Sequence, residues 1–196
     1  MPDSYLPAGV KHNGNISLLK SRKIALFCSS RCPGMVILHA LDLARELRSC
    51  PITVISGFHS SMEKECLDIF LRSGHPVIFC PSRSIERIRL PVPWKKAIEA
   101  GKILILSTFS SKLRRSTKKL AEERNRFVAS IADEVIIIHA SQGGKIESFA
   151  REIVESGKKI FTLESPTNKA LIEIGAKPFL PADVEKIWGV SPQASK

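Results

Sequence analysis

Six short apolar runs, each rich in β-branched residues, alternate along this chain with segments whose apolar residues recur at helical spacing. The runs occupy residues 23–30, 52–57, 76–81, 102–107, 134–140 and 159–165, and the helical patterns occupy 34–49, 61–74, 94–100, 111–131, 145–156 and 168–174. Buried parallel strands are typically continuous apolar runs, and strand–helix alternation favours an open sheet covered on both faces. We therefore predict a doubly wound, mostly parallel α/β fold of Rossmann-like type.

The length of 196 residues suits one well-packed domain and is short for two. We expect a single domain over residues 23–179, a flexible polar tail over 1–22, and a C-terminal tail over 180–196 whose periodicity is weak. No stretch approaches the roughly 18 apolar residues of a membrane span, and the first residues lack the apolar core of a secretory signal. We expect a cytoplasmic protein that does not contact membranes.

Cysteine and histidine spacing indicates neither a disulfide framework nor a metal site. The five cysteines are odd in number, form no CxxC pair and mostly lie in or beside apolar runs, where a thiol behaves as a small hydrophobic group. The five histidines form no HxxxH or HExxH pair. We expect reduced thiols, no metal and no cofactor.

The positive charge of the chain is concentrated in one region. The net charge is +11, and residues 83–126 contain thirteen basic and four acidic residues, a surplus of nine. Such a surplus attracts polyanions, of which nucleic acid is the commonest, although a solvated face that only aids solubility is the alternative. We predict that five of these cations form an approach for nucleic acid: Lys112, Arg114, Arg115, Lys118 and Lys119.

The loops that follow the predicted strands are rich in hydroxyl groups and glycine. In open α/β sheets, ligands bind outside the carboxyl ends of the strands, and backbone amides with small hydroxyls suit an oxyanion. The absence of GxGxxG and of GxxxxGK[ST] argues against ordinary NAD binding and P-loop ATP hydrolysis. The loop residues concerned are Ser29-Ser30-Arg31, Ser56-Gly57, Ser107-Thr108 and Ser141-Gln142-Gly143-Gly144.

An Arg-Asn-Arg run precedes the most apolar strand. On a helical wheel, Arg124 falls within an apolar stripe, whereas Arg126 points the other way. A buried arginine is destabilising by several kcal/mol unless its charge is met, so Arg124 should reach a carboxylate, strand-end carbonyl oxygens or a bound anion. The competing role for Arg124 is a purely structural one, in which it links the helix to the edge of the sheet. The structural role and the ligand-binding role are compatible. The stripe comprises Leu113, Leu120, Phe127, Val128 and Ile131.

The stretch ERNRFVASIADEVIIIHASQGGKIESFAREIVESGKKIFTL, followed by NKALIEIGA, resembles the core of the DprA/Smf family of DNA-processing proteins. Matching residues are Arg124, Asn125 and Arg126 of an RNR-led helix, Gly144 and Ser148 of the next loop and helix, and Asn168, Leu171, Ile172, Gly175 and Ala176 of the closing motif. Upstream, Ser30-Arg31 and Ser56-Gly57 resemble the family's G-S-R turn and S-G pair. The likeness spans about residues 23–179.

Several polar positions of the family's pattern are changed in this sequence. Its R-G-I-D is replaced by Ser60-Ser61-Met62-Glu63, a histidine by Leu67, and two glutamates by Thr108 and His139. The resemblance implies a protein that binds single-stranded DNA without strong sequence preference, dimerises through the Rossmann-like domain and passes the strand to a recombinase. Stacking aromatics would strengthen such binding, and Phe58, Trp94 and Phe109 are the candidates, each expected to pack rather than stack.

An enzyme is the rival class. The resemblance implies a Rossmann-like superfamily that also includes the lysine-decarboxylase-like phosphoribohydrolases. These enzymes cleave the N-glycosidic bond of nucleoside monophosphates with an arginine and a glutamate around a PGGxGTxxE motif. Gly143 and Gly144 agree with that motif, but its catalytic glutamate is replaced by Ala150. Glu147 or Glu63 would have to substitute, whereas the expected role of a glutamate on a helix face is a solvated one. A nucleotide sensor without turnover is a third possibility. His59 and His139 are candidates to contact phosphate or to move a proton, with a structural role as the alternative.

We predict a domain that binds phosphate-bearing ligands, foremost single-stranded DNA, and we assign no catalytic residue and no reaction. A homodimer and a recombinase partner are expected from the resemblance. The predicted ligand-binding residues are Ser30, Arg31, Ser56, Gly57, Ser107, Arg124, Asn125, Arg126, Gly143 and Gly144.

Overall fold

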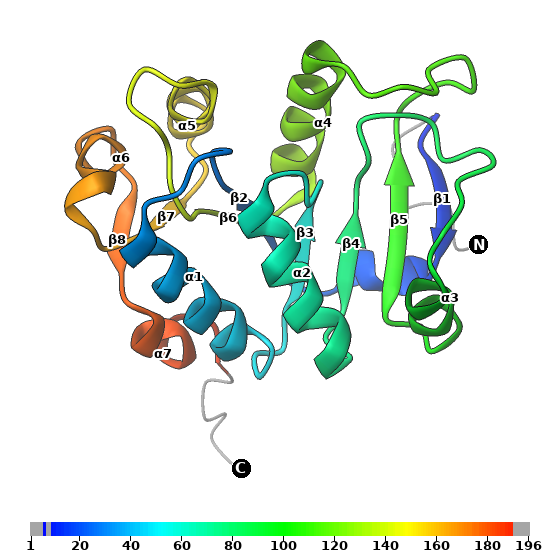
Figure 1. The fold of residues 1–196 in the computed structure, drawn as a ribbon, viewed down its shortest axis with the longest axis horizontal. Helices are drawn as coiled ribbons and strands as arrows, with labels where there is room; N and C mark the ends of the chain where they lie inside the picture. Colours follow the sequence, from blue (N-terminus) through cyan, green and yellow to red (C-terminus); the bar gives the residue numbers. More distant parts are fainter. Residues whose placement is uncertain (1–5, 7–8, 190–196) are drawn as a thin grey trace.

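The computed structural model describes residue 6 and residues 9–189. Over these residues the strands form one eight-stranded sheet in the order β1-β5-β4-β3-β2-β6-β7-β8 (Figure 1). The strands are β1 (Lys11–Gly14), β2 (Lys23–Phe27), β3 (Thr53–Ser56), β4 (Val77–Phe79), β5 (Ile103–Ser107), β6 (Glu134–Ile137), β7 (Ile160–Leu163) and β8 (Lys177–Phe179). All neighbouring pairs among them are parallel except β1 with β5, which confirms the predicted fold class.

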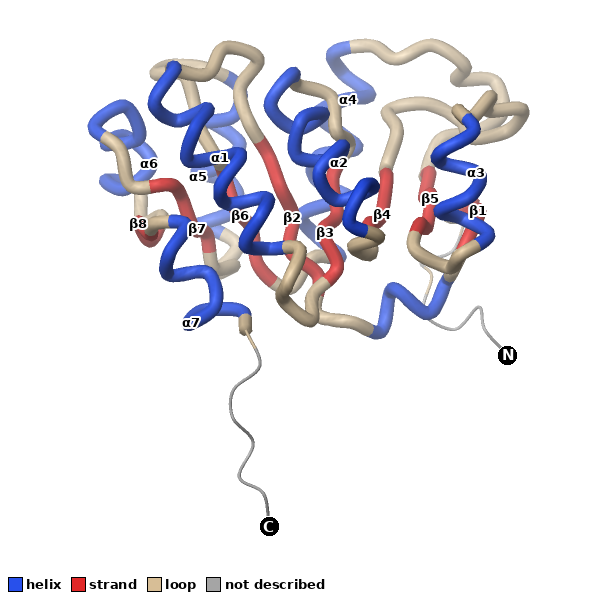
Figure 2. Tube along the Cα trace, turned by 60° about the horizontal axis from the view of Figure 1, so that its bottom comes forward, coloured by secondary structure: helices blue, strands red, loops and turns tan. Residues whose placement is uncertain are grey.

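Helices cover both faces of the sheet (Figure 2). The first face carries α1 (Gly34–Leu47), α2 (Ser61–Ser73), α3 (Val92–Glu99) and α7 (Val184–Trp188), and the second carries α4 (Lys118–Ile131), α5 (Lys145–Glu155) and α6 (Lys169–Glu173). Short 3-10 helices are η2 (Ile16–Lys20), η3 (Pro166–Asn168) and η4 (Pro181–Asp183). Each face has its own hydrophobic core.

Alternate residues of the central strands contribute to the two cores. In β2, Ile24 and Leu26 pack under the first face, whereas Ala25 and Phe27 pack under the second. Because successive side chains of a strand point to opposite faces, a strand that is covered on both sides needs an unbroken apolar run. This geometry explains why the strands read as continuous apolar segments in the sequence.

The chain reverses its direction of winding at β2. From β2 it proceeds outward through β3, β4 and β5, and it then returns to place β6 on the other side of β2. The loops after β2 and β6 therefore diverge to opposite sides of the sheet. A crevice at the carboxyl ends of strands is expected at such a switch point, between β2 and β6.

The structure corrects the tail predicted over residues 1–22. Strand β1 pairs antiparallel with β5, with Lys11 opposite Ser107, and η2 follows it. Leu18 and Leu19 pack against the second core, so this segment is part of the fold. Residues 1–5 and 7–8 of the predicted tail lie outside the described residues.

The structure also corrects the tail predicted over residues 180–196. Trp188 is 1% exposed and makes edge contacts with Phe161 and Phe179, at centroid distances of 5.0 and 5.2 Å. Its Nε1 donates to Glu134 Oε2 at 2.8 Å, and Arg22 Nη2 donates to the same oxygen at 2.7 Å. Glu134 therefore joins both predicted tails to the sheet. Residues 190–196 lie outside the described residues.

The helix predicted over residues 111–131 begins only at Lys118. Thr117 has extended backbone angles and is the N-cap, because its side chain accepts a hydrogen bond from the Leu120 amide at 3.2 Å. Serine and threonine favour caps over helix interiors, so Thr117 sets the N-terminal boundary of the helix. Leu113, placed in the apolar stripe by the sequence, lies in the preceding loop and is 39% exposed.

Candidate functional site

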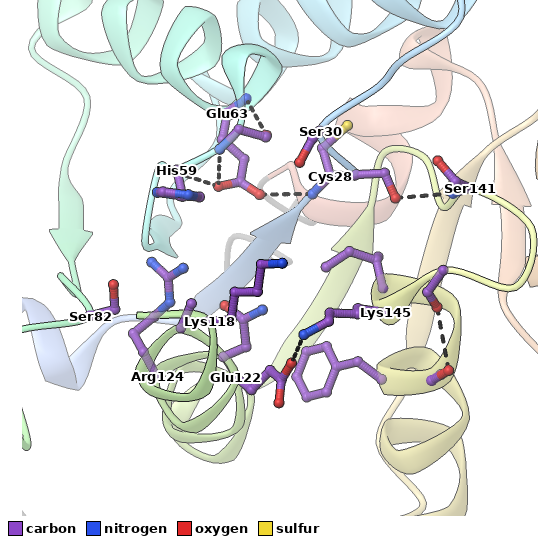
Figure 3. A pocket seen from close by; sticks show the side chains of 18 of the residues that line it. Cys28, Ser30, His59, Glu63, Ser82, Lys118, Glu122, Arg124, Ser141 and Lys145 are labelled. Atoms are coloured by element: carbon purple, nitrogen blue, oxygen red, sulfur yellow. Dashed lines mark hydrogen bonds and ion pairs between the residues drawn. The ribbon is translucent and has the colours of Figure 1, made fainter. Parts of the chain in front are cut away.

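A cavity of about 870 Å³ lies at the carboxyl ends of β2, β3, β4 and β6 (Figure 3). Its walls are the loops that follow these strands, together with α4 as far as Arg126, α5 as far as Glu152, and Glu63 in the first turn of α2. The lining residues comprise Cys28, Ser29, Ser30, Arg31, His59, Ser60, Glu63, Ser82, Ser116, Thr117, Lys118, Ala121, Glu122, Arg124, Asn125, Arg126, Ser141, Gly143, Gly144, Lys145, Ile146, Ser148, Phe149 and Glu152. The cavity thus occupies the predicted switch-point position.

Three helices begin at this cavity. The N-caps Ser60 of α2, Thr117 of α4 and Gly144 of α5 all line it. The first turn of a helix presents backbone N–H groups and the positive end of the helix dipole, so each of these ends favours negative charge. Convergence of three such ends makes an anion the favoured occupant.

Five cationic side chains add to this potential. Arg126 donates to Glu152 through two hydrogen bonds of 2.8 and 3.0 Å, and Lys145 pairs with Glu122. Within the residues that the structure describes, Arg31 and Lys118 form no ion pair and are exposed. These two cations can meet a phosphate without losing an existing partner. The fifth, Arg124, is buried.

Arg124 is 4% exposed, as its place in the apolar stripe predicted. Its Nη1 donates to the Cys80 carbonyl oxygen at 3.1 Å, just beyond the end of β4, which is one of the predicted partners. Arg124 Nε is buried, and among the residues described here it has no hydrogen-bond partner. Burial lowers the pKa of Arg124, and the nearby charge of Glu63 opposes this shift. In Figure 3 the guanidinium group points toward Glu63 and His59.

Gly57 provides the space that Arg124 occupies. A Cβ atom at this position would lie 0.8 Å from Arg124 Nη1 and 1.8 Å from Cζ. Gly57 was predicted to bind ligand and does not line the cavity. The structure instead shows it in contact with the arginine that lies at the cavity wall.

Glu63 is a site residue that sequence reasoning misjudged, because it was expected to be solvated. The side chain is 4% exposed, and its carboxylate accepts hydrogen bonds from Cys28 N at 2.9 Å and His59 N at 2.7 Å. Burial raises the pKa of Glu63, while these backbone donors and the charge of Arg124 lower it in part. The carboxylate thereby ties the loops after β2 and β3 together beneath the cavity (Figure 3).

The loop before α5 is held in a similar way. Glu147 Oε2 accepts from Gly143 N at 3.0 Å, and Arg151 donates to Oε1 at 2.9 Å, which lowers the pKa of Glu147. A Cβ at Gly144 would lie 2.7 Å from the Ser141 carbonyl oxygen, so the turn requires glycine. Glu147 is buried rather than solvated.

Not all of the predicted ligand-binding residues line the cavity. Ser30, Arg31, Asn125, Gly143 and Gly144 do so together with Arg124 and Arg126. Ser56 and Ser107 are buried, and each hydroxyl accepts from the amide two residues on, at 3.1 Å, in a local turn. Of the predicted approach residues, Lys118 lines the cavity, whereas Lys112, Arg114, Arg115 and Lys119 are exposed outside it.

The positions that depart from the family's pattern have different environments. His139 is buried, and its Nδ1 is hydrogen-bonded to Asn168 Oδ1 at 2.8 Å, so its role is structural. Leu67 belongs to the first core, and Thr108 is exposed. His59 is exposed and lines the cavity.

The candidate stacking aromatics pack against other side chains, as expected, although Trp94 is only half-buried. Phe58 and Phe109 are buried, and Trp94 makes an edge contact with Phe79 at a centroid distance of 5.0 Å.

Over the described part of the chain, no group of three or more His, Cys, Asp or Glu side chains could hold a metal ion. The five cysteines are free, and Cys28 lies in the cavity wall. In the same described residues, no helix has the length and apolar character needed to cross a bilayer.

Some lining residues carried a readable signal that the sequence analysis did not use. Ser60 and Glu63 form a capping box, and the pattern Ser-x-x-Glu before an apolar run indicates one. The remainder, such as Ser82 and Lys145, carry no local pattern that marks them, because only the fold brings them to the cavity.

The family model described as DNA recombination-mediator protein A matches residues 5–188. The chain belongs to this family. The resemblance recognised in the sequence is thereby confirmed, and the match extends to both segments that the structure adds to the predicted domain. A comparison with curated proteins gave no match.

Solved structures of the family share this fold. DNA processing protein A (DprA) from Streptococcus pneumoniae superposes with a TM-score of 0.77 at 19% identity, covering 96% of this chain and 73% of that one. DNA processing protein A from Helicobacter pylori, described for its single-stranded DNA binding mode, gives 0.74 at 24% identity, covering 95% and 90%. The molybdenum cofactor carrier protein of Chlamydomonas reinhardtii is a more distant match, with a TM-score of 0.58 at 10% identity over 84% and 94%.

Proposed function

We propose that this protein binds single-stranded DNA in the cavity between β2 and β6, as a step in DNA processing, uptake or recombination. The observation that carries the proposal is the convergence of three helix N-termini with Arg31 and Lys118, two cations that form no ion pair within the described part of the chain. Membership of the DNA recombination-mediator protein A family and the likeness to a Helicobacter pylori relative described as binding single-stranded DNA support it.

Contact with the sugar-phosphate backbone is the favoured mode. Cations and backbone amides recognise phosphate oxygens irrespective of base, and binding of this kind weakens steeply with salt. Phe58 and Phe109 are buried and Trp94 packs against Phe79, so these three rings do not offer a stacking platform. Weak sequence preference is therefore expected.

Binding without a reaction is the role that the carboxylates support. The alternative, a nucleotide N-glycosidic hydrolase, requires a carboxylate that is free to act on substrate. Glu63 is engaged by the Cys28 and His59 amides, and Glu147 by Gly143 and Arg151. Ala150, at the position of the hydrolase motif's glutamate, is buried in the second core.

Assembly and partners form the finer part of the proposal. As the family resemblance implies, the protein would act as a cytoplasmic homodimer and pass bound single-stranded DNA to a recombinase. Met35 and Leu38 of α1 are 66% and 56% exposed, and apolar side chains that lie on a surface at this level are available for contact with a second chain. The oligomeric state measured by light scattering tests the dimer.

Fluorescence anisotropy of labelled oligo-dT across a salt series tests the DNA proposal. The wild type should show a negative slope of log affinity against log salt, with about 0.7 for each phosphate contacted. Replacing both Arg31 and Lys118 by Gln should reduce this slope by about 1.4 and weaken binding roughly tenfold near 0.1 M salt. The double variant Arg124→Ala with Arg126→Ala should bind more weakly than the Arg31 and Lys118 variant. Arg124 also supports the fold.

A matched control removes two positive charges far from the cavity. Lys177 lies in β8 and Lys186 in α7, and both are exposed. Replacing both by Gln should leave affinity and slope almost unchanged, because distant surface charges are screened. Absence of wild-type binding at low salt would overturn the proposal. In that event, thermal stabilisation and base release with nucleoside monophosphates would test the sensor and hydrolase alternatives.

A further inference from the structure

Two basic loops lie side by side beyond the ends of β4 and β5, at the upper right of Figure 1. The first spans residues 82–91 and the second residues 110–117. Ser84 N donates to the Leu113 carbonyl oxygen at 2.8 Å, and Ser107 Oγ donates to the Arg83 carbonyl oxygen at 2.8 Å. We name the cations of these joined loops the basic lobe: Arg83, Arg87, Arg89, Lys112, Arg114 and Arg115.

The charge of the basic lobe is not neutralised by the protein. All six side chains are exposed, and among the residues that the structure describes none of the six forms an ion pair. The loops contain one acidic residue, Glu86, which pairs with Lys11 at the start of β1. Six like charges held on one surface are destabilising toward one another, and an anionic ligand relieves this repulsion.

The basic lobe is continuous with the cavity. Ser82, at the start of the first loop, lines the cavity, and Ser116 and Thr117, at the end of the second, line it as well. A chain that leaves the cavity across the N-terminus of α4 therefore meets the lobe directly. The aromatic residue of this region, Phe109, is buried, and Ile85 is buried with it, so the lobe offers charge rather than a surface for bases.

We propose that the basic lobe is a second binding site, which holds the sugar-phosphate backbone of a single strand beyond the nucleotides seated in the cavity. The proposal rests on the DNA-binding function proposed above and extends it to a ligand longer than the cavity. Arg83, Arg87 and Arg89, which the sequence analysis did not assign to the site, then form one side of the path, and Lys112, Arg114 and Arg115 form the other.

Comparison of two oligonucleotide lengths distinguishes binding to the basic lobe from binding to the cavity. Single-strand grooves cover about 4 to 16 nucleotides. A labelled oligo-dT of about 4 nucleotides should therefore occupy the cavity alone, whereas one of about 16 nucleotides should occupy the cavity and the basic lobe together. The test variant replaces Arg83 and Arg89 by Gln. Arg83 holds the loops through its backbone carbonyl oxygen, and the substitution keeps that bond. The control variant is again Lys177→Gln with Lys186→Gln.

The expected result is a roughly tenfold loss of affinity of the variant for the longer strand, with a salt slope smaller by about 1.4, and an unchanged affinity for the shorter one. The control should match the wild type with both lengths. An unchanged affinity and slope for the longer strand would overturn the second site while leaving the cavity proposal standing.

An equal loss with both lengths, at an unchanged thermal midpoint, would also overturn the second site, since it would place Arg83 and Arg89 in the first. Absence of wild-type binding to either length would overturn both proposals. The three failures are therefore distinguishable in one data set.

Discussion

The contact between Gly57 and Arg124 makes a residue-scale prediction. A methyl group at position 57 would overlap the guanidinium, which must then leave the Cys80 carbonyl. We predict that Gly57→Ala lowers the free energy of unfolding by about 1–3 kcal/mol, as overpacking does elsewhere. Urea denaturation measures the change. Gly34→Ala is the control, because a Cβ there meets nothing within 4 Å, and it should be nearly neutral.

A double-mutant cycle identifies Arg124 as the cause of this loss. In an Arg124→Ala background the overlap is absent, so Gly57→Ala should be far less destabilising than in the wild type. Equal losses in the two backgrounds would show that the glycine acts through something other than this contact.

At the residue scale, the inward orientation of Arg124 was predictable and the role of Glu63 was not. The helical wheel places Arg124 among apolar residues, and burial follows from that local pattern. Glu63 is buried because the Cys28 amide, 35 residues earlier in the chain, donates to it. The local Ser-x-x-Glu pattern indicates the capping box with Ser60 but not this long-range contact with Cys28. Ser56 and Ser107 were misjudged for a related reason, since their hydroxyls serve turns of their own loops.

The start of α4 makes a prediction at the scale of the element. Thr117 satisfies the Leu120 amide, and Lys118 in the first turn reaches the cavity. Thr117→Ala should lower the free energy of unfolding by about 1 kcal/mol, while Thr117→Ser should retain the cap. Thermal or urea denaturation measures both. Ser116→Ala, at the adjacent exposed position, should change stability little, and a loss as large as that of Thr117→Ala would contradict the capping role.

The ends of α1 and α2 make a prediction about pH. His75 follows α2, is 4% exposed, and its Nδ1 contacts the carbonyl oxygen of Arg48 at the end of α1, at 3.2 Å. Burial lowers the pKa of His75 from 6.5 to about 4. Between these values the unfolded chain binds a proton that the folded protein does not, so stability falls as the pH falls from 6.5 to 4. The shift corresponds to about 3 kcal/mol at most.

The variant His75→Asn keeps a donor for the Arg48 carbonyl and removes the titrating group. The difference in free energy of unfolding between wild type and variant should shift in favour of the variant as the pH falls from 6.5 to 4. Urea denaturation at a series of pH values measures it. A difference that stays constant over that window would contradict the lowered pKa of His75.

Element boundaries were predictable where the chain carries its own stop signals. Gly74, in left-handed conformation, ends α2, and its φ of 67° suits glycine. The helix that contains the RNR run was predicted to begin too early, because Leu113 completed an apolar stripe by spacing alone. The Thr117 cap outweighs that spacing, and the Leu113 backbone instead hydrogen-bonds to Ser84 in the neighbouring loop.

The docking of the C-terminal segment makes a prediction for the whole molecule. Trp188 is 1% exposed against Phe161 and Phe179, and its indole N–H meets Glu134. Trp188→Ala should lower the free energy of unfolding by about 3–5 kcal/mol. Trp188→Phe keeps an aromatic ring, though a smaller one, and loses the hydrogen bond to Glu134, which should be destabilising by about 1 kcal/mol or more.

Lys186→Ala is the matched control for Trp188, because Lys186 lies on the same helix and is exposed. It should change stability by less than about 0.5 kcal/mol. Urea denaturation followed by far-UV circular dichroism measures all three variants. A Trp188→Ala protein as stable as the control would contradict the assignment of this segment to the core.

At the scale of the molecule, the parallel sheet was predictable from its apolar runs, while its two edge strands were not. Strands β1 and β8 are short, β1 (KHNG) has no apolar side chain and β8 (KPF) is only partly apolar, and they pair with the outer edges of β5 and β7. Both supposed tails are fixed by partners far away in sequence, such as the Arg22 and Trp188 contacts with Glu134. Neither contact is visible in the hydrophobic periodicity of the chain, because each joins residues that are far apart in sequence.

The carboxylate beneath the cavity has a kinetic consequence. Because Glu63 binds the amides of Cys28 and His59, the loops after β2 and β3 are ordered by the protein's own charge. A ligand therefore has little chain to order on arrival, and preorganised sites lose less conformational entropy on binding. Association should then be limited by encounter, accelerated by the positive field, and its rate constant should fall with ionic strength while the dissociation rate constant changes less.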